Sequence, residues 1–401
     1  MSPVRQLSHH RKVARRGAVL GAATLALATA LAACGSSGAN AGPTSATSTS
    51  AAGSSSSGGP LSDTVAQLMQ PVGSFTYPAD PIKNVSALSG KTVYFIPITQ
   101  QAPQFGIEGT ALSAGLAKAG IKVQTCDGNS NPSDINKCVG QATGAHAGAI
   151  VMDAVPYVLA SNSLDAARGQ GIPVLIVNQV VDPKYPASKD LGYVGSDLGS
   201  KMLQAAADWI ADDSGGSADV LMDSATDSPS SIAYGQAAQD ELAKQCPGCK
   251  MTVNKIQSAN FSLIAPSTSS ALLKTPGVNY VVSEYDQFLQ PVYGGVQQAG
   301  KTTAVKGVSS AAGMSGLQML KNKQFLSADV GASPVFEGWA EADAALRLMS
   351  GQSVPDYDIP VRLFTRDNVG SLDLSSAAEN SGAWYGPTDY AAGFTKVWGV
   401  S

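Results

Sequence analysis

Residues 93–98 read Val-Tyr-Phe-Ile-Pro-Ile, and this short apolar stretch decides the fold class. Nearly continuous apolar runs of this length are typical of strands that are buried on both faces of a parallel sheet. An amphipathic stretch at residues 105–119 follows, which we predict as a helix, and residues 121–126 are the next predicted strand. The order strand, helix, strand is the repeating unit of doubly wound α/β folds.

The same alternation continues along the chain in two series. The first series of predicted strands covers residues 93–98, 121–126, 149–152 and 174–177, and the second covers residues 219–222, 251–256, 280–282 and 303–308. Predicted helices between them include residues 198–211, residues 287–299 and one that is capped by Ser133 or Asp134. We therefore predict an α/β protein with two lobes, each a doubly wound parallel sheet, and ligands of such sheets bind beyond the carboxyl ends of the strands.

The start of the chain has the pattern of an export signal. Its basic residues are Arg5, Arg11, Lys12, Arg15 and Arg16, with no acid among residues 1–33. An apolar run over residues 17–33 ends in Leu-Ala-Ala-Cys, which resembles a bacterial lipobox. We predict a signal peptide over residues 1–33 and acylation of Cys34, which would anchor the protein to the outer face of the cell membrane. A membrane-spanning helix is the alternative, but the run is short for a bilayer. Arg15-Arg16 could also belong to a twin-arginine export signal, so the export route stays open.

Composition after the signal excludes several classes of function. Residues 34–60 are nearly all Ser, Gly, Ala and Thr, so we expect a flexible tether there. The signal holds five of the 26 basic residues and none of the 30 acidic ones, which leaves 21 against 30 and a net charge of −9. Nucleic acids are therefore unlikely partners, because they require basic surfaces.

Enzyme chemistry is disfavoured by the scarcity of histidine. Of three His, two lie in the signal, and His146 stands alone in a Gly- and Ala-rich segment. A Ser-His-Asp triad would depend on this one residue, and no multi-histidine metal site can form. We expect no enzymatic activity, no cofactor and no metal site, although paired carboxylates are not excluded by the sequence.

Four cysteines beyond Cys34 indicate an oxidising compartment. We favour local pairing, Cys126 with Cys138 and Cys246 with Cys249, among the three possible connectivities. The Cys-Pro-Gly-Cys spacing at residues 246–249 also occurs in redox motifs. However, those motifs begin a helix after a strand, whereas this one follows a predicted helix, so a structural role is the better interpretation.

Six short segments carry a resemblance to a known family. They are residues 99–105, Thr-Gln-Gln-Ala-Pro-Gln-Phe; 177–179, Val-Asn-Gln; 193–197, Tyr-Val-Gly-Ser-Asp; 283–286, Ser-Glu-Tyr-Asp; 297–300, Gln-Gln-Ala-Gly; and 365–369, Thr-Arg-Asp-Asn-Val. In order and spacing, residues 91–368 resemble a type I periplasmic binding protein of the ribose/galactose-binding family, which serves ABC importers. The resemblance implies two lobes that close on a ligand and three hinge crossings, expected near Asp197, residues 331–334 and Leu363. Repressors with the same two lobes carry an N-terminal DNA-binding motif. This chain has its predicted signal there instead, so we do not expect a repressor.

This resemblance sets our domain boundaries. We expect a first lobe of residues 91–197 plus 333–363 and a second lobe of residues 198–332 plus 364–401, with residues 61–90 as an extension of unknown role. The tail from residue 371 is rich in aromatic residues. We expect it to pack on the outside of a lobe, and docking to a permease or covering the ligand site are the alternatives.

The family places its ligand contacts at matching strand ends. Carried over onto this sequence, these positions are Gln101, Gln104, Phe105, Asp153, Asn178, Gln179, Tyr234, Tyr285, Asp286 and Ser309. Phe105 keeps the aromatic that stacks on a sugar ring, with packing at the helix start as its alternative role. For Asp153 the alternative role is to cap the following helix.

The departures from the family pattern are informative. Asn178-Gln179 stands where sugar binders have Asp-Arg, Tyr234 lies near the position of another Arg, and Ser309 replaces an Asp. A site without Arg offers fewer charge-assisted hydrogen bonds, so we expect an uncharged ligand.

A sugar or polyol is the first choice of ligand, and a nucleoside or small aromatic is the second. Import by an ABC permease and ligand sensing through a membrane receptor both fit the sequence. Neighbouring permease and ATPase genes would favour import. We expect a monomer.

Overall fold

The protein is described from a computed structural model, which places residues 59–400. Among these residues no helix is long and apolar enough to cross a membrane. The predicted signal, Cys34 and nearly all of the predicted tether lie outside the described residues.

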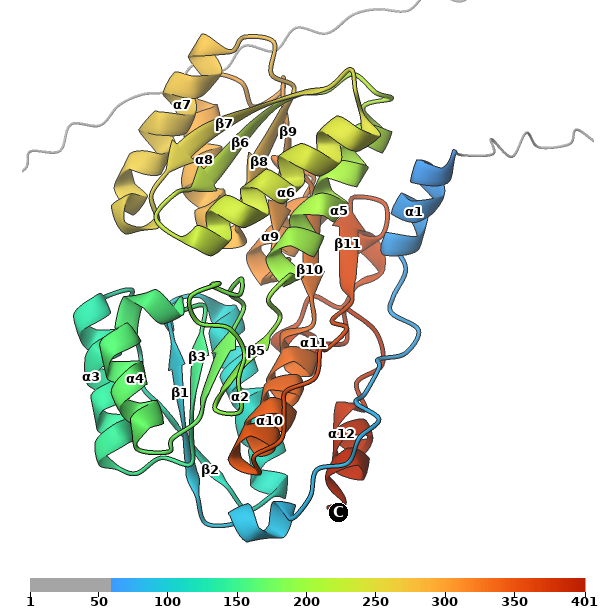
Figure 1. The fold of residues 1–401 in the computed structure, drawn as a ribbon. Helices are drawn as coiled ribbons and strands as arrows, with labels where there is room; N and C mark the ends of the chain where they lie inside the picture. The colour runs from blue at the N-terminus through green and yellow to red at the C-terminus, as the bar shows by residue number, and fades with distance from the viewer. Residues whose placement is uncertain (1–58, 401) are drawn as a thin grey trace, which may run out of the picture. The chain divides into compact units, whose positions relative to one another are not determined.

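The first sheet contains five parallel strands in the order β2-β1-β3-β4-β5 (Figure 1). Their bounds are β1 Thr92–Pro97, β2 Lys122–Thr125, β3 Ala149–Asp153, β4 Val174–Val177 and β5 Leu191–Val194. Alternate residues of β1 enter different clusters: Val93 and Phe95 pack with residues of α2 and α10, whereas Tyr94 and Ile96 pack with residues of α3 and α4. Helices thus cover both faces of this sheet, as its apolar strands predict.

The helices of this lobe come from two distant parts of the chain. They are α2 Pro103–Lys118, α3 Pro132–Gly144, η2 Tyr157–Ala160, α4 Ser161–Gly169 and α10 Pro334–Met349, with η1 Val85–Leu88 ahead of β1. Gly338 lets α10 approach α2 closely, because a Cβ at this position would overlap the backbone oxygen of Glu108. Helices α2 and α10 therefore pack in direct contact with each other.

The second sheet has the order β11-β10-β9-β8-β6-β7. Its strands are β6 Asp219–Ala225, β7 Lys250–Ile256, β8 Tyr280–Ser283, β9 Lys306–Ser310, β10 Leu326–Ala332 and β11 Val361–Thr365. Its helices are α5 Leu198–Asp213, α6 Pro229–Gln245, η3 Ser258–Leu263, α7 Ile264–Lys274, α8 Asp286–Gln298, α9 Met314–Lys321 and η4 Val369–Ser371. All neighbouring strands are parallel except β10 and β11, which are antiparallel. The predicted two-lobed α/β fold is confirmed, with three strands that we did not predict: β5, β10 and the antiparallel edge strand β11.

Some local predictions need correction. The cap of α3 is Asn131, whose side chain accepts a hydrogen bond from the Ser133 N–H, so Ser133 and Asp134 lie inside the helix. An Asn directly before Pro at the first helical position is itself a favourable start signal. Strand β9 begins at Lys306, three residues later than predicted, because residues 301–305 form a turn.

The chain crosses between the lobes three times in the core of the fold. It passes from β5 to α5, from β10 to α10, and from α10 back to β11 (Figure 1). The last crossing is complete before Val361, because β11 already pairs with β10. Residues 361–363 therefore belong with the second sheet, in contrast to our expected boundary.

The extension before β1 contacts both lobes. Helix α1 Pro60–Leu68 packs against α5 and β11. Farther along, Phe75 stacks on Phe336 of α10, with ring centroids 4.4 Å apart, and the Ile82 N–H donates to Val397 O. The extension thus links elements of both lobes, a role that the sequence did not indicate.

The end of the aromatic tail packs against α10 of the first lobe, whereas our boundary had placed all of residues 364–401 in the second lobe; Tyr385 does remain there, against Phe364 of β11. After α11 Ser376–Ser381, helix α12 Tyr390–Trp398 stacks Trp398 on Trp339, with ring centroids 5.7 Å apart. The five aromatic side chains of the tail are at most 3% exposed: Trp384, Tyr385, Tyr390, Phe394 and Trp398. Packing on a lobe is confirmed for these rings, which excludes them as an exposed docking surface.

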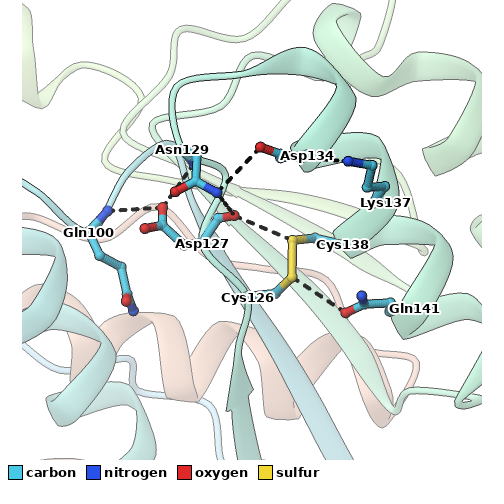
Figure 2. Close-up of a disulfide and its surroundings, with 8 residues drawn as sticks. All are labelled: Gln100, Cys126, Asp127, Asn129, Asp134, Lys137, Cys138 and Gln141. Atoms are coloured by element: carbon cyan, nitrogen blue, oxygen red, sulfur yellow. Dashed lines mark hydrogen bonds and ion pairs between the residues drawn. A yellow bond between two sulfur atoms is a disulfide. The ribbon is translucent and has the colours of Figure 1, made fainter. Parts of the chain in front are cut away.

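The structure pairs the cysteines locally, as predicted. Cys126 bonds to Cys138 and Cys246 to Cys249. Figure 2 shows that the first disulfide joins the end of β2 to α3, beside a turn in which the Asp127 carboxylate accepts from the Gln100 and Asn129 N–H groups at 3.1 and 2.9 Å. The hydrogen bond from the Gln100 N–H to Asp127 thereby joins the loop after β1 to the loop after β2.

Candidate functional site

The loops after the strands of the two sheets meet at Ser230, near the start of α6. The Ser230 hydroxyl donates to Gln179 Oε1 at 2.7 Å and accepts from the Val180 N–H at 3.1 Å. Tyr234, one turn later, donates to Asn178 O at 3.2 Å. Residues that follow β4 in the first lobe are thus bonded directly to a helix of the second lobe.

Asn178, directly after β4, is a first-lobe residue with several contacts in this region. Its φ of 55° lies in the left-handed region, which Asn tolerates better than most residues. Its Nδ2 lies 3.2 Å from Asp153 Oδ1 and 3.5 Å from Glu108 Oε2. The amide therefore donates toward two carboxyl groups, and Asp153 does not cap the following helices, whose caps are other residues.

The predicted residues of the first loop differ in exposure. Gln101 is exposed, and its N–H donates to Thr99 Oγ1 at 3.2 Å. Gln104 is half-buried in the first turn of α2. Phe105 is buried, yet within the described residues it belongs to none of the three hydrophobic clusters. Its ring is thus covered in the first turn of α2, where both core packing and ligand contact were expected roles.

On the second-lobe side, the predicted residues mostly bind one another. The Tyr285 hydroxyl lies 3.0 Å from Ser231 Oγ. Ser309 is fully buried and donates to Asp286 Oδ1 at 2.7 Å, while Asp286 Oδ2 accepts from the Gly313 N–H at 2.8 Å. Burial raises the pKa of Asp286 to about 6. The polar atoms of Ser309, Asp286 and Tyr285 are therefore paired inside their own lobe.

Tyr234 also has a clear structural role. Its ring lies on Gly199, since a Cβ at that position would overlap the ring atoms, and it belongs to the cluster between α5, α6 and the sheet. Only its hydroxyl reaches the first lobe. The residue is placed to bond across the lobes rather than to stack on a ligand.

A group of buried carboxyl groups lies next to Asn178. Glu108 of α2, Asp153 of β3 and Glu337 and Glu341 of α10 are at most 5% exposed. One carboxylate oxygen from each of Glu108, Asp153 and Glu341 lies within 4.8 Å of the others. We call these four residues the carboxyl cluster.

Burial is the largest cause of the raised pKa values in the carboxyl cluster. It raises the pKa of Asp153 to about 6 and of Glu337 to about 8, and it raises the pKa of Glu108 and Glu341 well above the ordinary range. Like charges add to this effect, because two unit charges 4 Å apart repel by about 4 kcal/mol at an effective dielectric constant of 20. The four carboxyl groups therefore cannot all be ionised in this space unless a cation binds between them. Without a cation, some of them must hold a proton.

Sequence reasoning found Asp153 but missed the other members of the carboxyl cluster. The spacing of Glu337 and Glu341 was an available signal, because residues four apart lie on one face of a helix and α10 is otherwise mostly apolar. Ser230 and Ser231 were also missed, although they follow a strand end. Glu108 carried no such signal, since it lies inside a helix whose start we had already assigned.

Two doubly wound lobes that meet through the loops at their strand ends define a two-lobed α/β binding protein. The chain belongs to the periplasmic binding protein domain family, whose model matches residues 93–353. The predicted resemblance to type I periplasmic binding proteins is thereby confirmed. No curated protein sequence matches the chain.

Several solved structures have the same fold at low sequence identity. A sugar ABC transporter protein from Yersinia enterocolitica is 17% identical, with a TM-score of 0.64 over 80% of this chain and 100% of that one. The solute-binding protein of a 5-methylthioribose transporter from Thermotoga lettingae is 17% identical, with a TM-score of 0.63 over 77% and 99%. The myo-inositol-binding protein of Caulobacter is 20% identical, with a TM-score of 0.61 over 73% and 97%.

Proposed function

We propose that this chain is an extracytoplasmic solute-binding lipoprotein. It captures a small uncharged sugar or polyol between its lobes and delivers it to an ABC permease. Cys34 anchors it to the outer face of the membrane, and the chain acts as a binding protein rather than an enzyme.

The observation that carries this proposal is the chemistry of the loops that meet between the lobes. Across the lobes, the Gln179 side-chain amide accepts from the Ser230 hydroxyl, and the Asn178 backbone carbonyl accepts from the Tyr234 hydroxyl. Amides and hydroxyls donate and accept hydrogen bonds without a net charge, as a polyhydroxylated neutral ligand requires. None of the ten predicted ligand residues is Lys or Arg.

The solved structures support the same class of ligand. The proteins with this fold include one in complex with 5-methylthioribose, one bound to myo-inositol and one bound to α-D-tagatopyranose. A sugar or polyol is therefore our first choice for this chain.

A nucleoside or small aromatic ligand is the second candidate, and the ring of Phe105 favours it. Aromatic rings stack on flat or ring-shaped ligands, and Phe105 stands in the first turn of α2, directly after the loop that follows β1. Sensing through a membrane receptor would use the same binding step as import.

The test is a thermal-shift screen of the purified chain against myo-inositol, 5-methylthioribose, tagatose, allitol, nucleosides and small aromatics. A ligand present at a thousandfold excess over its dissociation constant adds about 4 kcal/mol to the free energy of unfolding. We expect stabilisation by a sugar or polyol. Stabilisation by a nucleoside only would replace the ligand class, and no response across the panel would contradict the proposal.

The stabilising compound is then titrated into Phe105→Leu. This variant keeps an apolar side chain but removes the ring, and we expect the affinity to fall at least about tenfold, the equivalent of about 1.4 kcal/mol. Phe261→Ala is the control, because that ring is 49% exposed and outside the predicted site. Equal affinity in Phe105→Leu and the wild type would remove Phe105 from the site.

A further inference from the structure

The carboxyl cluster has the composition of a cation site. Oxygen atoms of Glu108, Asp153 and Glu341, contributed by α2, β3 and α10, lie within 4.8 Å of one another. Glu337 lies one helical turn before Glu341 and is 5% exposed. Three separate elements thus direct carboxyl groups into one small volume.

Several of these oxygens are buried without a hydrogen-bond partner. Within residues 59–400, both carboxylate oxygens of Glu341 and the Oδ2 atom of Asp153 have none. Glu341 and Asp153 are both fully buried. Buried polar atoms are nearly always paired, so unpaired ones at a shared point indicate a missing partner.

Helix α10 provides an internal comparison two residues later. Asp343 is equally buried, but its carboxylate accepts from Arg347 Nε at 2.6 Å, Tyr357 OH at 2.5 Å and Trp398 Nε1 at 2.6 Å. The fold therefore supplies donors and a positive charge to a buried acid whose role is structural. It supplies neither to Glu341, and none of the ion pairs among residues 59–400 involves the carboxyl cluster.

We infer that Glu108, Asp153 and Glu341 bind a hard divalent metal cation, with Glu337 beside the site. Carboxylate oxygens are the ligands that Ca²⁺ and Mg²⁺ prefer. Calcium–oxygen distances of about 2.3–2.6 Å place oxygens on opposite sides of the ion about 4.6–5.2 Å apart, which accommodates the observed separations. The site favours Ca²⁺ over Mg²⁺, because Mg²⁺ retains several waters and this site is closed by protein.

A bound cation would connect the two helices that cover one face of the first sheet to the end of a central strand. Asn178 then has a second role, since it donates to Asp153 Oδ1 and leaves Oδ2 without a hydrogen-bond partner, so that this oxygen is available to the metal. A set of bound protons is the rival state, in which the carboxyl groups are neutral and no metal enters.

The test compares the wild type with Glu341→Gln. The purified full chain is stripped with EDTA, the chelator is removed, and CaCl₂ is titrated by calorimetry, with MgCl₂ and MnCl₂ in parallel. We expect one equivalent of cation to bind and to raise the melting temperature. In Glu341→Gln the affinity should fall at least about 100-fold, because even residues that only support metal ligands contribute 10–100-fold.

A second readout separates loss of the site from loss of the fold. Gln keeps the shape of Glu and removes one like charge, so the metal-free variant should melt at or above the temperature of the metal-free wild type. Asp223→Asn is the matched control: Asp223 is also fully buried but lies in the second lobe, and the variant should bind the cation as the wild type does. The inference is overturned if none of the three cations binds the wild type, or if both variants lose binding equally.

Discussion

The bond network of Ser230 makes a quantitative prediction about the contact between the lobes. Ser230→Ala removes two hydrogen bonds, to Gln179 Oε1 at 2.7 Å and from the Val180 N–H at 3.1 Å. Each contributes about 1 kcal/mol net. The variant should therefore shift the equilibrium between contacting and separated lobes by about 2 kcal/mol, or roughly 30-fold.

Ser231→Ala is a control that matches this change closely. Ser231 is the next residue, is also buried and loses the same atom, but its hydroxyl pairs with Tyr285 inside the second lobe. Hydrogen exchange of the amide of Val180 reads the interlobe bond directly, without any ligand. We expect exchange to be roughly 30-fold faster in Ser230→Ala and unchanged in Ser231→Ala. Unchanged exchange in Ser230→Ala, or equal acceleration in both variants, would refute the assignment of Ser230 as the residue that bonds Val180 across the lobes.

Two further predictions concern stability. Burial raises the pKa of Asp223 to about 7 and of Glu284 to about 8, so between pH 4 and these values the folded chain holds protons that the unfolded chain has released. The free energy of unfolding in EDTA should therefore rise as the pH falls from 8 to 5, by up to about 1.4 kcal/mol per pH unit for each group, and the melting temperature should rise with it; a flat or falling profile would contradict this. Gly338→Ala should destabilise the chain by about 1–3 kcal/mol because its Cβ would overlap Glu108 O, whereas Gly140→Ala in α3, where a Cβ meets no atom within 4 Å, should stabilise it by about 0.5–1 kcal/mol. Denaturant unfolding would measure both, and effects of the same sign would show that α2 and α10 are not in close contact.

The fold was predictable because its information is local. Most strands are short apolar runs, such as Val-Leu-Ile-Val of β4, so neighbouring residues indicate the alternation; the interior strand β10, Leu-Ser-Ala-Asp-Val-Gly-Ala, is not such a run and was missed. Strand β5 was missed because Gly interrupts its apolar run, Leu-Gly-Tyr-Val, whereas the equally short β4 is apolar throughout. The antiparallel partner β11 was missed because strand direction depends on the path of residues 350–360 between α10 and β11, which has no periodic pattern.

The site was only partly predictable, because its chemistry depends on which elements come together. The strand-end rule located Asp153 and Asn178, and the structure bonds them to each other. The same rule selected Ser309 and Asp286, whose polar atoms are already satisfied within their lobe. A strand end predicts proximity to the site, but it does not predict whether the side chain is free to bind a ligand.

Glu341 and Asp343 show where sequence reasoning reaches its limit. Both are acids in the buried part of one helix, two residues apart, and their local sequence does not distinguish them. They point to different neighbours: Asp343 meets Arg347 of its own helix and Trp398 of the distant tail, whereas Glu341 meets two more acids, Glu108 and Asp153. An uncompensated acid is therefore a property of the assembled fold, and Glu341→Gln asks whether a cation supplies the charge that the rest of the described chain does not.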